Sequence, residues 1–284
     1  MTSSHTPVAG KAPAAPAAAR TRLSPRRRRS LLRGAQYVVL AGAVVAVAVL
    51  ADWHQLQQQF LQLSVAKRMF PDLLTVALAN TVAYTLSGFG VGLALGVIIA
   101  LMRLSSVAPY RWLASLYIEV FRGLPALLIF IFIGVGVPLA FPGLAIPGGA
   151  YGQVAVALGL VAAAYMAETI RAGIQAVPRG QMEAARTLGM SHVRAMWSIV
   201  IPQAFRIIVP PLTNELVLLF KDSSLVLFLG VSLQTRELTK FGRDLAGETA
   251  NTTPIFVAGL CYLLITVPLG YVVRRLEAGH AKAR

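Results

Sequence analysis

The stretch EAARTLGMSHVRAMWSIVIP, residues 183–202, is a compact charged segment inside a chain that is otherwise rich in apolar residues. Its residue types predict two short helices joined by a turn. Gly189 can adopt the left-handed conformation that ends a helix, and Ser191 can cap the start of the next one. Pro202 is expected to end the second helix. The stretch therefore predicts a helix–turn–helix elbow.

The two helices of the elbow have different apolar sides. The first presents small or apolar residues, namely Ala184, Ala185 and Leu188. The second repeats apolar residues at the spacing of a single helix face, at Val193, Met196, Trp197 and Val200. Such a face fits either a lipid surface or the groove of a partner protein, and periodicity does not choose between them.

The composition of the whole chain indicates a membrane protein. Of the 284 residues, 56% are hydrophobic and 13% charged, and the mean hydropathy is +0.68. Soluble domains carry about 25% charged residues. The 26 Lys and Arg against 11 Asp and Glu would suggest nucleic acid in a soluble protein. Here the excess suits membrane orientation instead, and we expect no nucleic-acid partner. The lone Cys261 excludes an internal disulfide.

Six apolar segments approach the length of about 20 residues that a span needs. They are roughly 35–51, 72–101, 113–137, 152–170, 203–229 and 254–273. In the second segment Gly88, Gly92 and Gly96 share one helix face, which favours close approach of a neighbouring helix over plain apolar filler. Proline predicts kinked or unwound backbone in two other segments, at Gly123–Pro125 and at Pro210–Pro211.

The positive charges predict an orientation. Nineteen Lys and Arg lie in 1–34, 102–112, 171–206 and 274–284, and five lie on the other side, namely Lys67, Arg68, Arg236, Lys240 and Arg243. Arg122 and Lys221 fall within spans or at their ends. Because Lys and Arg collect on the cytoplasmic side, both termini and the elbow are expected in the cytoplasm.

The N-terminal region is expected to hold a basic tail and an anchor. Residues 1–34 are rich in Ala, Pro and Arg, and we expect them to be disordered. The span 35–51 that follows is interpreted as an uncleaved signal anchor. A cleaved signal peptide ending near 49–52 is the alternative.

Catalytic motifs are absent from the sequence. It has no HExxH, GxSxG, CxxC or GxxxxGK[ST] pattern, and its four histidines are isolated. We therefore predict a chain that is not an enzyme, binds no metal and has no phosphate loop of its own.

Ionisable and polar groups in or near the spans are candidates for a substrate path, because charge in hydrocarbon usually faces partners or water. The candidates are Glu119, Arg122, Glu168, Asn214 and Glu215. Glu119 and Arg122 are three residues apart and would be able to pair. A structural role for each residue singly is the alternative.

These residues resemble the permease subunits of ATP-binding-cassette importers. Their cytoplasmic loop pattern maps onto Glu183-Ala184-Ala185, Gly189, Ile199 and Pro202, with Ile201 where leucine is usual. Segments 117–130, 165–190 and 202–225 resemble the branch that takes up polar amino acids, and the resemblance covers roughly 72–275.

The resemblance implies a fold and a mechanism. The fold is all-α: a polytopic bundle with the five-helix core of a type I importer at 72–275, plus one N-terminal span. The loop at about 171–202 would couple to a cytoplasmic ATPase dimer that binds ATP and Mg, with no cofactor on this chain. A second permease subunit, identical or different, a solute-binding protein and an amino acid would complete the importer in a bacterial inner membrane. A stand-alone secondary transporter or channel is the alternative, and an exporter or lipid-processing enzyme a remoter one.

Overall fold

The computed structural model describes residues 25–144 and 146–281, which fall into two compact units divided after Trp53. Within these residues the protein is helical, without strands, as the all-α prediction requires. The first unit contains helix α1 (Pro25–Leu50), which begins before the predicted span 35–51 and takes in residues 25–34 of the predicted tail. Residues 1–24 lie outside the described residues.

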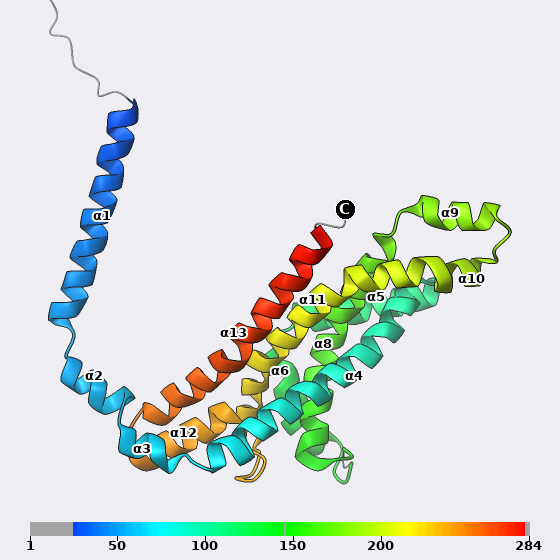
Figure 1. Ribbon diagram of the computed structural model, residues 1–284. Helices are drawn as coiled ribbons and strands as arrows, with labels where there is room; N and C mark the ends of the chain where they lie inside the picture. Colours follow the sequence, from blue (N-terminus) through cyan, green and yellow to red (C-terminus); the bar gives the residue numbers. More distant parts are fainter. Residues whose placement is uncertain (1–24, 145, 282–284) are drawn as a thin grey trace, which may run out of the picture. The chain divides into compact units, whose positions relative to one another are not determined.

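The second unit is a bundle of long helices connected by shorter ones (Figure 1). The long helices are α4 (Ala79–Leu104), α5 (Ala108–Gly123), α8 (Gly149–Gln175), α11 (Ile201–Asp222) and α13 (Thr253–Ala281). The short helices before the elbow are α2 (Trp53–Phe60), α3 (Leu63–Arg68), α6 (Ala126–Ile131) and α7 (Val137–Ala140). Those in and after it are α9 (Arg179–Thr187), α10 (His192–Ala195) and α12 (Leu238–Thr249). Among the described residues, three segments are π-helical, namely Leu73–Leu78, Phe132–Gly136 and Met196–Val200. Residues Ser223–Leu229 form a 3₁₀ helix.

Five of the described helical segments are long and apolar enough to cross a membrane, and the bent pair of α5 with α6–α7 makes a possible sixth. The bend is 104° and falls between Gly123 and Ala126. Leu124 and Pro125 are extended there, with ψ of 141° and 131°. The predicted break at Gly123–Pro125 is therefore confirmed.

The glycine stripe of α4, formed by Gly88, Gly92 and Gly96, packs closely against another helix and confirms the predicted close approach. A Cβ atom built on Gly88 would lie 2.5 Å from the Cβ of Leu158, and one on Gly92 would lie 2.8 Å from that of Ala162. At Gly96 the corresponding distance to Met166 is 3.0 Å. The helix that fits against the stripe is α8.

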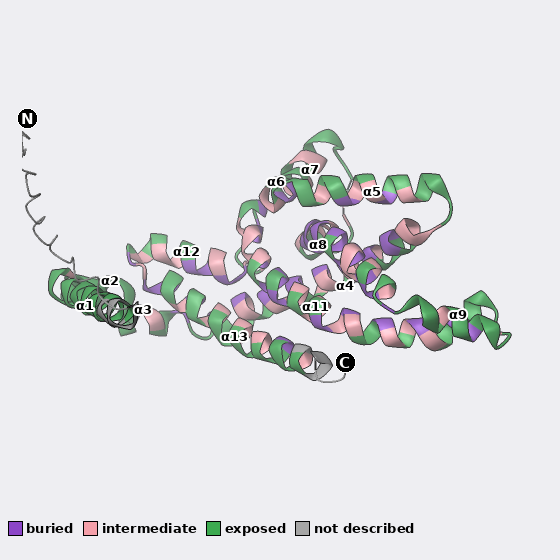
Figure 2. Cartoon of the chain, turned by 90° about the horizontal axis from the view of Figure 1, so that it is seen from above, coloured by how far each residue is buried: buried purple, intermediate pink, exposed green. Residues whose placement is uncertain are grey.

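Helix α8 occupies the centre of the bundle. Figure 2 shows it nearly end-on, with buried residues around most of its circumference. One apolar cluster joins it to Tyr84 of α4 and Leu219 of α11, and a second joins it to Ile118 of α5 and Ile208 of α11. A helix that is apolar on all sides suits this central position.

The structure of α11 differs from the prediction at two prolines. The helix runs through Pro210 and Pro211 without a break, so the unwinding expected at these prolines is wrong. Pro210 is buried in the bundle, where neighbouring helices can hold a proline-containing turn in helical geometry.

At the end of the bundle away from the elbow, side chains of α4 hold the loop that precedes α12 (Figure 1). The Asn80 amide donates to the carbonyl oxygens of Gln234 and Arg236, at 2.9 and 3.0 Å. The Tyr84 hydroxyl donates to the carbonyl of Thr235 at 2.5 Å. These bonds pair polar groups that burial would otherwise leave unsatisfied, and so fix the loop against α4.

Glu237 caps α12 from a fully buried position. Its carboxylate accepts from the backbone N–H groups of Thr239 and Lys240, at 2.5 and 2.7 Å, and from the Tyr262 hydroxyl at 3.0 Å. Burial raises the pKa of Glu237 above its ordinary value, and these hydrogen bonds only partly oppose the rise.

The raised pKa of Glu237 predicts a pH dependence of stability. The folded state holds this proton more tightly than the unfolded state, so the contribution is complete below the ordinary carboxyl pKa of about 4.3 and is lost as pH rises through the folded-state pKa. We expect Glu237→Gln to remove this part of the decline in melting temperature between acid and neutral pH, measured in detergent. The exposed Glu248→Gln on the same helix should keep the wild-type decline. An unchanged pH profile in Glu237→Gln would contradict the assignment.

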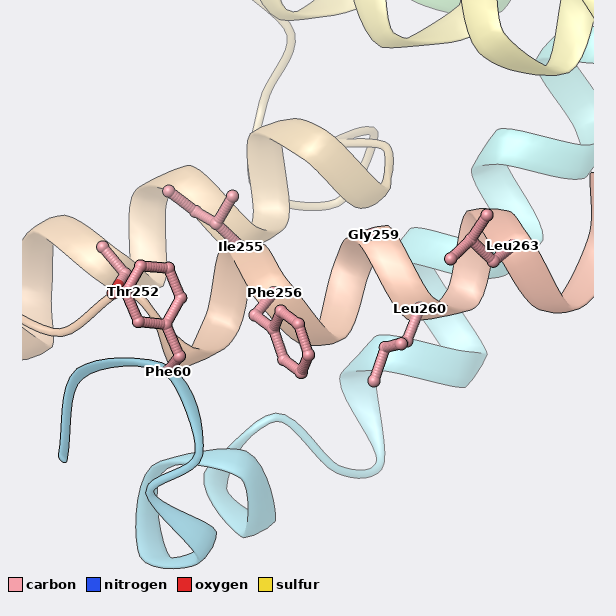
Figure 3. Close-up of a pocket in the computed structure, with 7 residues that line it drawn as sticks. All are labelled: Phe60, Thr252, Ile255, Phe256, Gly259, Leu260 and Leu263. Atoms are coloured by element: carbon pink, nitrogen blue, oxygen red, sulfur yellow. The ribbon is translucent and has the colours of Figure 1, made fainter. Parts of the chain in front are cut away.

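The outer face of α13 is apolar and exposed, as expected for a helix that contacts lipid. An open groove of about 420 Å³ lies along it, beside the end of α2 (Figure 3). Phe60 and Phe256 meet edge to face in it, with ring centroids 6.4 Å apart. The other lining residues are Thr252, Ile255, Gly259, Leu260 and Leu263.

Candidate functional site: the elbow and the charged residues of the bundle

The elbow predicted from residues 183–202 is present and joins α8 to α11. After α9, Gly189 has a φ of +84°, in the left-handed region that favours glycine. Ser191 then caps α10, its side-chain oxygen accepting from the backbone N–H of Arg194 at 3.3 Å. The predicted turn and cap are therefore confirmed.

The predicted end of the second helix at Pro202 is wrong. Pro202 lies in the first turn of α11, and helical structure continues from α10 through the wide turn at Met196–Val200 into that helix. The side-chain amide of Gln203 donates to the carbonyl of Ile199 at 2.9 Å, which satisfies an acceptor beside the proline. The second half of the elbow is thus continuous with a long helix of the bundle.

The apolar residues of the elbow divide between two surroundings. Val200 is buried and Met196 packs against the same cluster, together with α4, α5 and α8. Val193 and Trp197, in contrast, are 66% and 67% exposed. The predicted single apolar face is therefore split, and its outer part is free to contact a partner or lipid.

The residues expected to couple to an ATPase surround this turn. Glu183 and Ala184 are exposed on α9, whereas Ala185 is buried and anchors that helix. Ile199 is half-buried and Pro202 exposed. Leu188, next to the turn, is 84% exposed. An exposed leucine, valine and tryptophan on a short charged elbow give it apolar contact surface for a protein groove.

Three of the proposed path residues are linked electrostatically. Arg122, at the end of α5, attracts both Glu168 of α8 and Glu215 of α11. Its guanidinium carbon lies 5.3 Å from the centre of the Tyr165 ring. Arg122 is exposed, and both glutamates are half-buried. Among the described residues Arg122 forms an ion pair with neither glutamate, so this attraction acts at longer range than a contact.

The other two path candidates stand apart from this group. Glu119 and Asn214 are exposed, and Glu119 belongs to none of the ion pairs among the described residues. The pair that the sequence suggested between Glu119 and Arg122 is therefore not formed. Glu168 instead pairs with Arg171, at 2.6 Å between Nη2 and Oε2.

Sequence reasoning overlooked Arg171 and Arg103, which both attract Glu168. Arg171 follows Glu168 by three residues, so helical spacing alone was enough to predict that pair. Arg103 is far away in sequence and gave no such signal. It comes near α8 because the glycine stripe lets α4 and α8 pack closely.

An apolar helical bundle with charged groups in its spans and an exposed elbow between two of them has the features expected of a membrane transport component. The chain belongs to the family of binding-protein-dependent transport system inner membrane components, whose match covers residues 92–281. A family that works as one component of a larger system removes the alternative of a stand-alone transporter or channel.

Individual relatives agree with this assignment. A probable glutamine ABC transporter permease of Bacillus subtilis is 40% identical over 194 residues, which cover 66% of this chain and 85% of the relative. A glutamate/aspartate import permease of Escherichia coli O157:H7 is 35% identical and covers 70% and 90% respectively. The solved structure of an amino acid ABC transporter with histidines is 35% identical, with a TM-score of 0.67 over 76% of this chain and 97% of that one. The protein is thus a multi-pass membrane permease of an ABC importer.

Proposed function

We propose that this chain forms the membrane path of an ATP-driven importer of amino acids. Relatives named for glutamine, glutamate/aspartate and arginine transport, each at least 35% identical, support this substrate class. A solute-binding protein delivers the amino acid from outside, and a second permease subunit, identical or different, completes the path. The assembly lies in a bacterial cytoplasmic membrane, with the termini of this chain in the cytoplasm.

The observation that carries the coupling part of the proposal is the exposed elbow. Its Glu183 and Gly189 correspond to the coupling pattern of importer permeases, and Leu188, Val193 and Trp197 add apolar surface around them. We propose that the elbow docks into a cytoplasmic ATPase dimer, which binds ATP and Mg. The proposed coupling residues are Glu183, Ala184, Ala185, Gly189, Ile199 and Pro202, of which the buried Ala185 holds α9 in place while the exposed residues face the ATPase.

Reconstitution tests this function directly. Proteoliposomes that contain the chain with its ATPase and binding protein should accumulate a labelled amino acid only when ATP and Mg are present on the ATPase side. The chain alone should transport nothing down an ion gradient. Uptake by the chain alone would contradict the proposal.

We further propose that Arg122 binds the α-carboxylate of the passing amino acid while Glu215 or Glu168 faces its ammonium group. A zwitterion carries one charge of each sign, and Arg122 attracts both acidic residues across three helices of the bundle. Glu119 and Asn214 border the same path from exposed positions.

The role of Arg122 predicts a defect in substrate affinity. A hydrogen bond to a charged group contributes roughly 1.5–3 kcal/mol, so Arg122→Gln should raise the KM of uptake by about tenfold or more. ATP hydrolysis stimulated by the binding protein should persist. Arg243→Gln, which removes an exposed positive charge from α12 outside the proposed path, is the control and should leave KM within about twofold. Equal effects of the two variants would rule out a specific role for Arg122.

A further inference from the structure

Helix α1 begins with a dense group of positive charges. Five arginines, Arg26–Arg29 and Arg33, here called the arginine run, lie directly before and within the start of the apolar segment Leu32–Leu50. No Asp or Glu occurs before Asp52. The acidic residue nearest in sequence, Asp52, follows the far end of α1, 19 residues after Arg33.

The arginine run does not stabilise the helix to which it belongs. The N-terminus of a helix has a partial positive charge, so basic residues in the first turns disfavour the helix. The first turn of α1 contains no acidic residue to offset this. Arg29 and Arg33 are exposed, and neither forms an ion pair or hydrogen bond with another residue in the described part of the chain. Their charges are available for an external anion.

The arginine run also lies outside the part of the chain shared with the family. The family match begins at residue 92. The solved amino acid transporter is covered over 97% of its length by only 76% of this chain. The arginine run therefore lies outside the residues that the family model matches.

The depth of the arginine run identifies the anion. The 19-residue apolar segment begins at Leu32, with a mean hydropathy of 1.8. Arg26 to Arg33 then extend only about 10 Å along the helix axis, which is the thickness of a headgroup layer and close to the Debye length of about 8 Å. The helix positions of these residues correspond to the depth of lipid phosphates, and arginine binds phosphate through paired N–H donors.

We propose that the arginine run binds the phosphate groups of anionic phospholipids at the membrane surface, and so fastens α1 to an anionic leaflet. This binding of arginine to lipid phosphate takes place in the mature protein. It is separate from any effect of the same charges on membrane insertion. The inference depends on α1 being in the membrane, and not on the amino-acid substrate.

Lipid retention on the purified full-length protein tests the proposal. The protein is equilibrated in mixed micelles of equal phosphatidylglycerol and phosphatidylcholine, and bound lipids are counted by native mass spectrometry. We expect phosphatidylglycerol to be enriched on wild type, and its affinity to fall at least about tenfold when all five arginines become glutamine. The enrichment should also fall steeply as salt is raised from about 0.05 to 0.5 M, because screening shortens the range of the attraction.

Two further variants separate this role from others. Replacing the five arginines with lysine keeps the charge that guides insertion, and should keep affinity within about threefold of wild type. Lys67→Gln with Arg68→Gln removes exposed charge from α3 and should change nothing.

Three outcomes would overturn the inference. They are enrichment that does not depend on salt in wild type, enrichment that survives the glutamine substitutions, and equal loss in the α3 control. Loss of a co-purifying ATPase in the glutamine variant with lipid binding unchanged would assign the arginine run to a protein partner instead. The salt titration on wild type shows whether the lipid is held by charge, and the comparison of the glutamine and lysine variants, each checked for insertion, assigns that charge to the arginine run.

Discussion

Gly189→Val should reduce ATP-driven uptake strongly while the protein still inserts and folds. Gly189 has a φ of +84°, and a β-branched residue held there costs roughly 1–3 kcal/mol in backbone strain. The turn can relieve this strain only by changing the angle between α9 and α10, the two helices proposed to enter the ATPase. Coupling between sites of roughly 1–3 kcal/mol corresponds to changes of about 5- to 150-fold, so uptake should fall by about tenfold or more.

Two control variants are needed to interpret the result for Gly189→Val. Gly189→Asn should retain much of the uptake, because asparagine tolerates the left-handed conformation better than other residues with side chains. Gly180→Ala changes a glycine of α9 whose Cβ position is open, and should leave uptake unchanged. The measurement is uptake per ATP hydrolysed in proteoliposomes. Wild-type coupling in Gly189→Val would show that the turn geometry does not matter.

Gly92→Leu should prevent stable folding of the bundle. The first added carbon would lie 2.8 Å from the Cβ of Ala162 and 3.4 Å from the carbonyl oxygen of Gly159. Helices α4 and α8 must therefore separate to accept a leucine. Overpacking in a close-packed core costs about 1–3 kcal/mol, and more where backbone must move.

Another glycine of α4, Gly90, provides a matched control for this prediction. Gly90 is exposed, and a Cβ atom there meets nothing within 4 Å, so Gly90→Leu should fold normally. The measurement is the monodisperse yield in detergent and the melting temperature of each variant. Equal behaviour of the two leucine variants would mean that α4 and α8 are not packed through the glycine stripe.

Local sequence signals predicted the parts of this protein that depend on a few neighbouring residues. Glycines at four-residue spacing identified the packing face of α4, and Gly189 with Ser191 identified the turn and cap of the elbow. Each of these features follows from the backbone preference or the size of the residue itself. The break after Gly123 belongs to the same class, because Pro125 disfavours helix at the preceding residue.

The errors arose where tertiary packing overrides a local preference. Pro210–Pro211 disfavour a regular helix in isolation, yet α11 includes both because the surrounding bundle supports it. Pro202 is a different case, because it is exposed and lies in the first turn of α11, where proline is tolerated. Periodicity also placed Val193 and Trp197 on one face with Val200, although only Val200 reaches the core. The attraction of Arg122 for Glu168 and Glu215 joins three helices, and no spacing along the chain reports such proximity.

The helical continuity between the elbow and α11 gives the elbow a mechanical advantage. With 22 residues at about 1.5 Å each, α11 extends about 33 Å from its start at Ile201. A rigid rod of that length works as a lever arm: tilting its base by about 10° displaces the far end by about 6 Å. Glu215 lies in the C-terminal half of α11, far from the elbow. A small rotation of the elbow would therefore displace Glu215, and the proposed path around it, by a larger distance than the elbow itself moves.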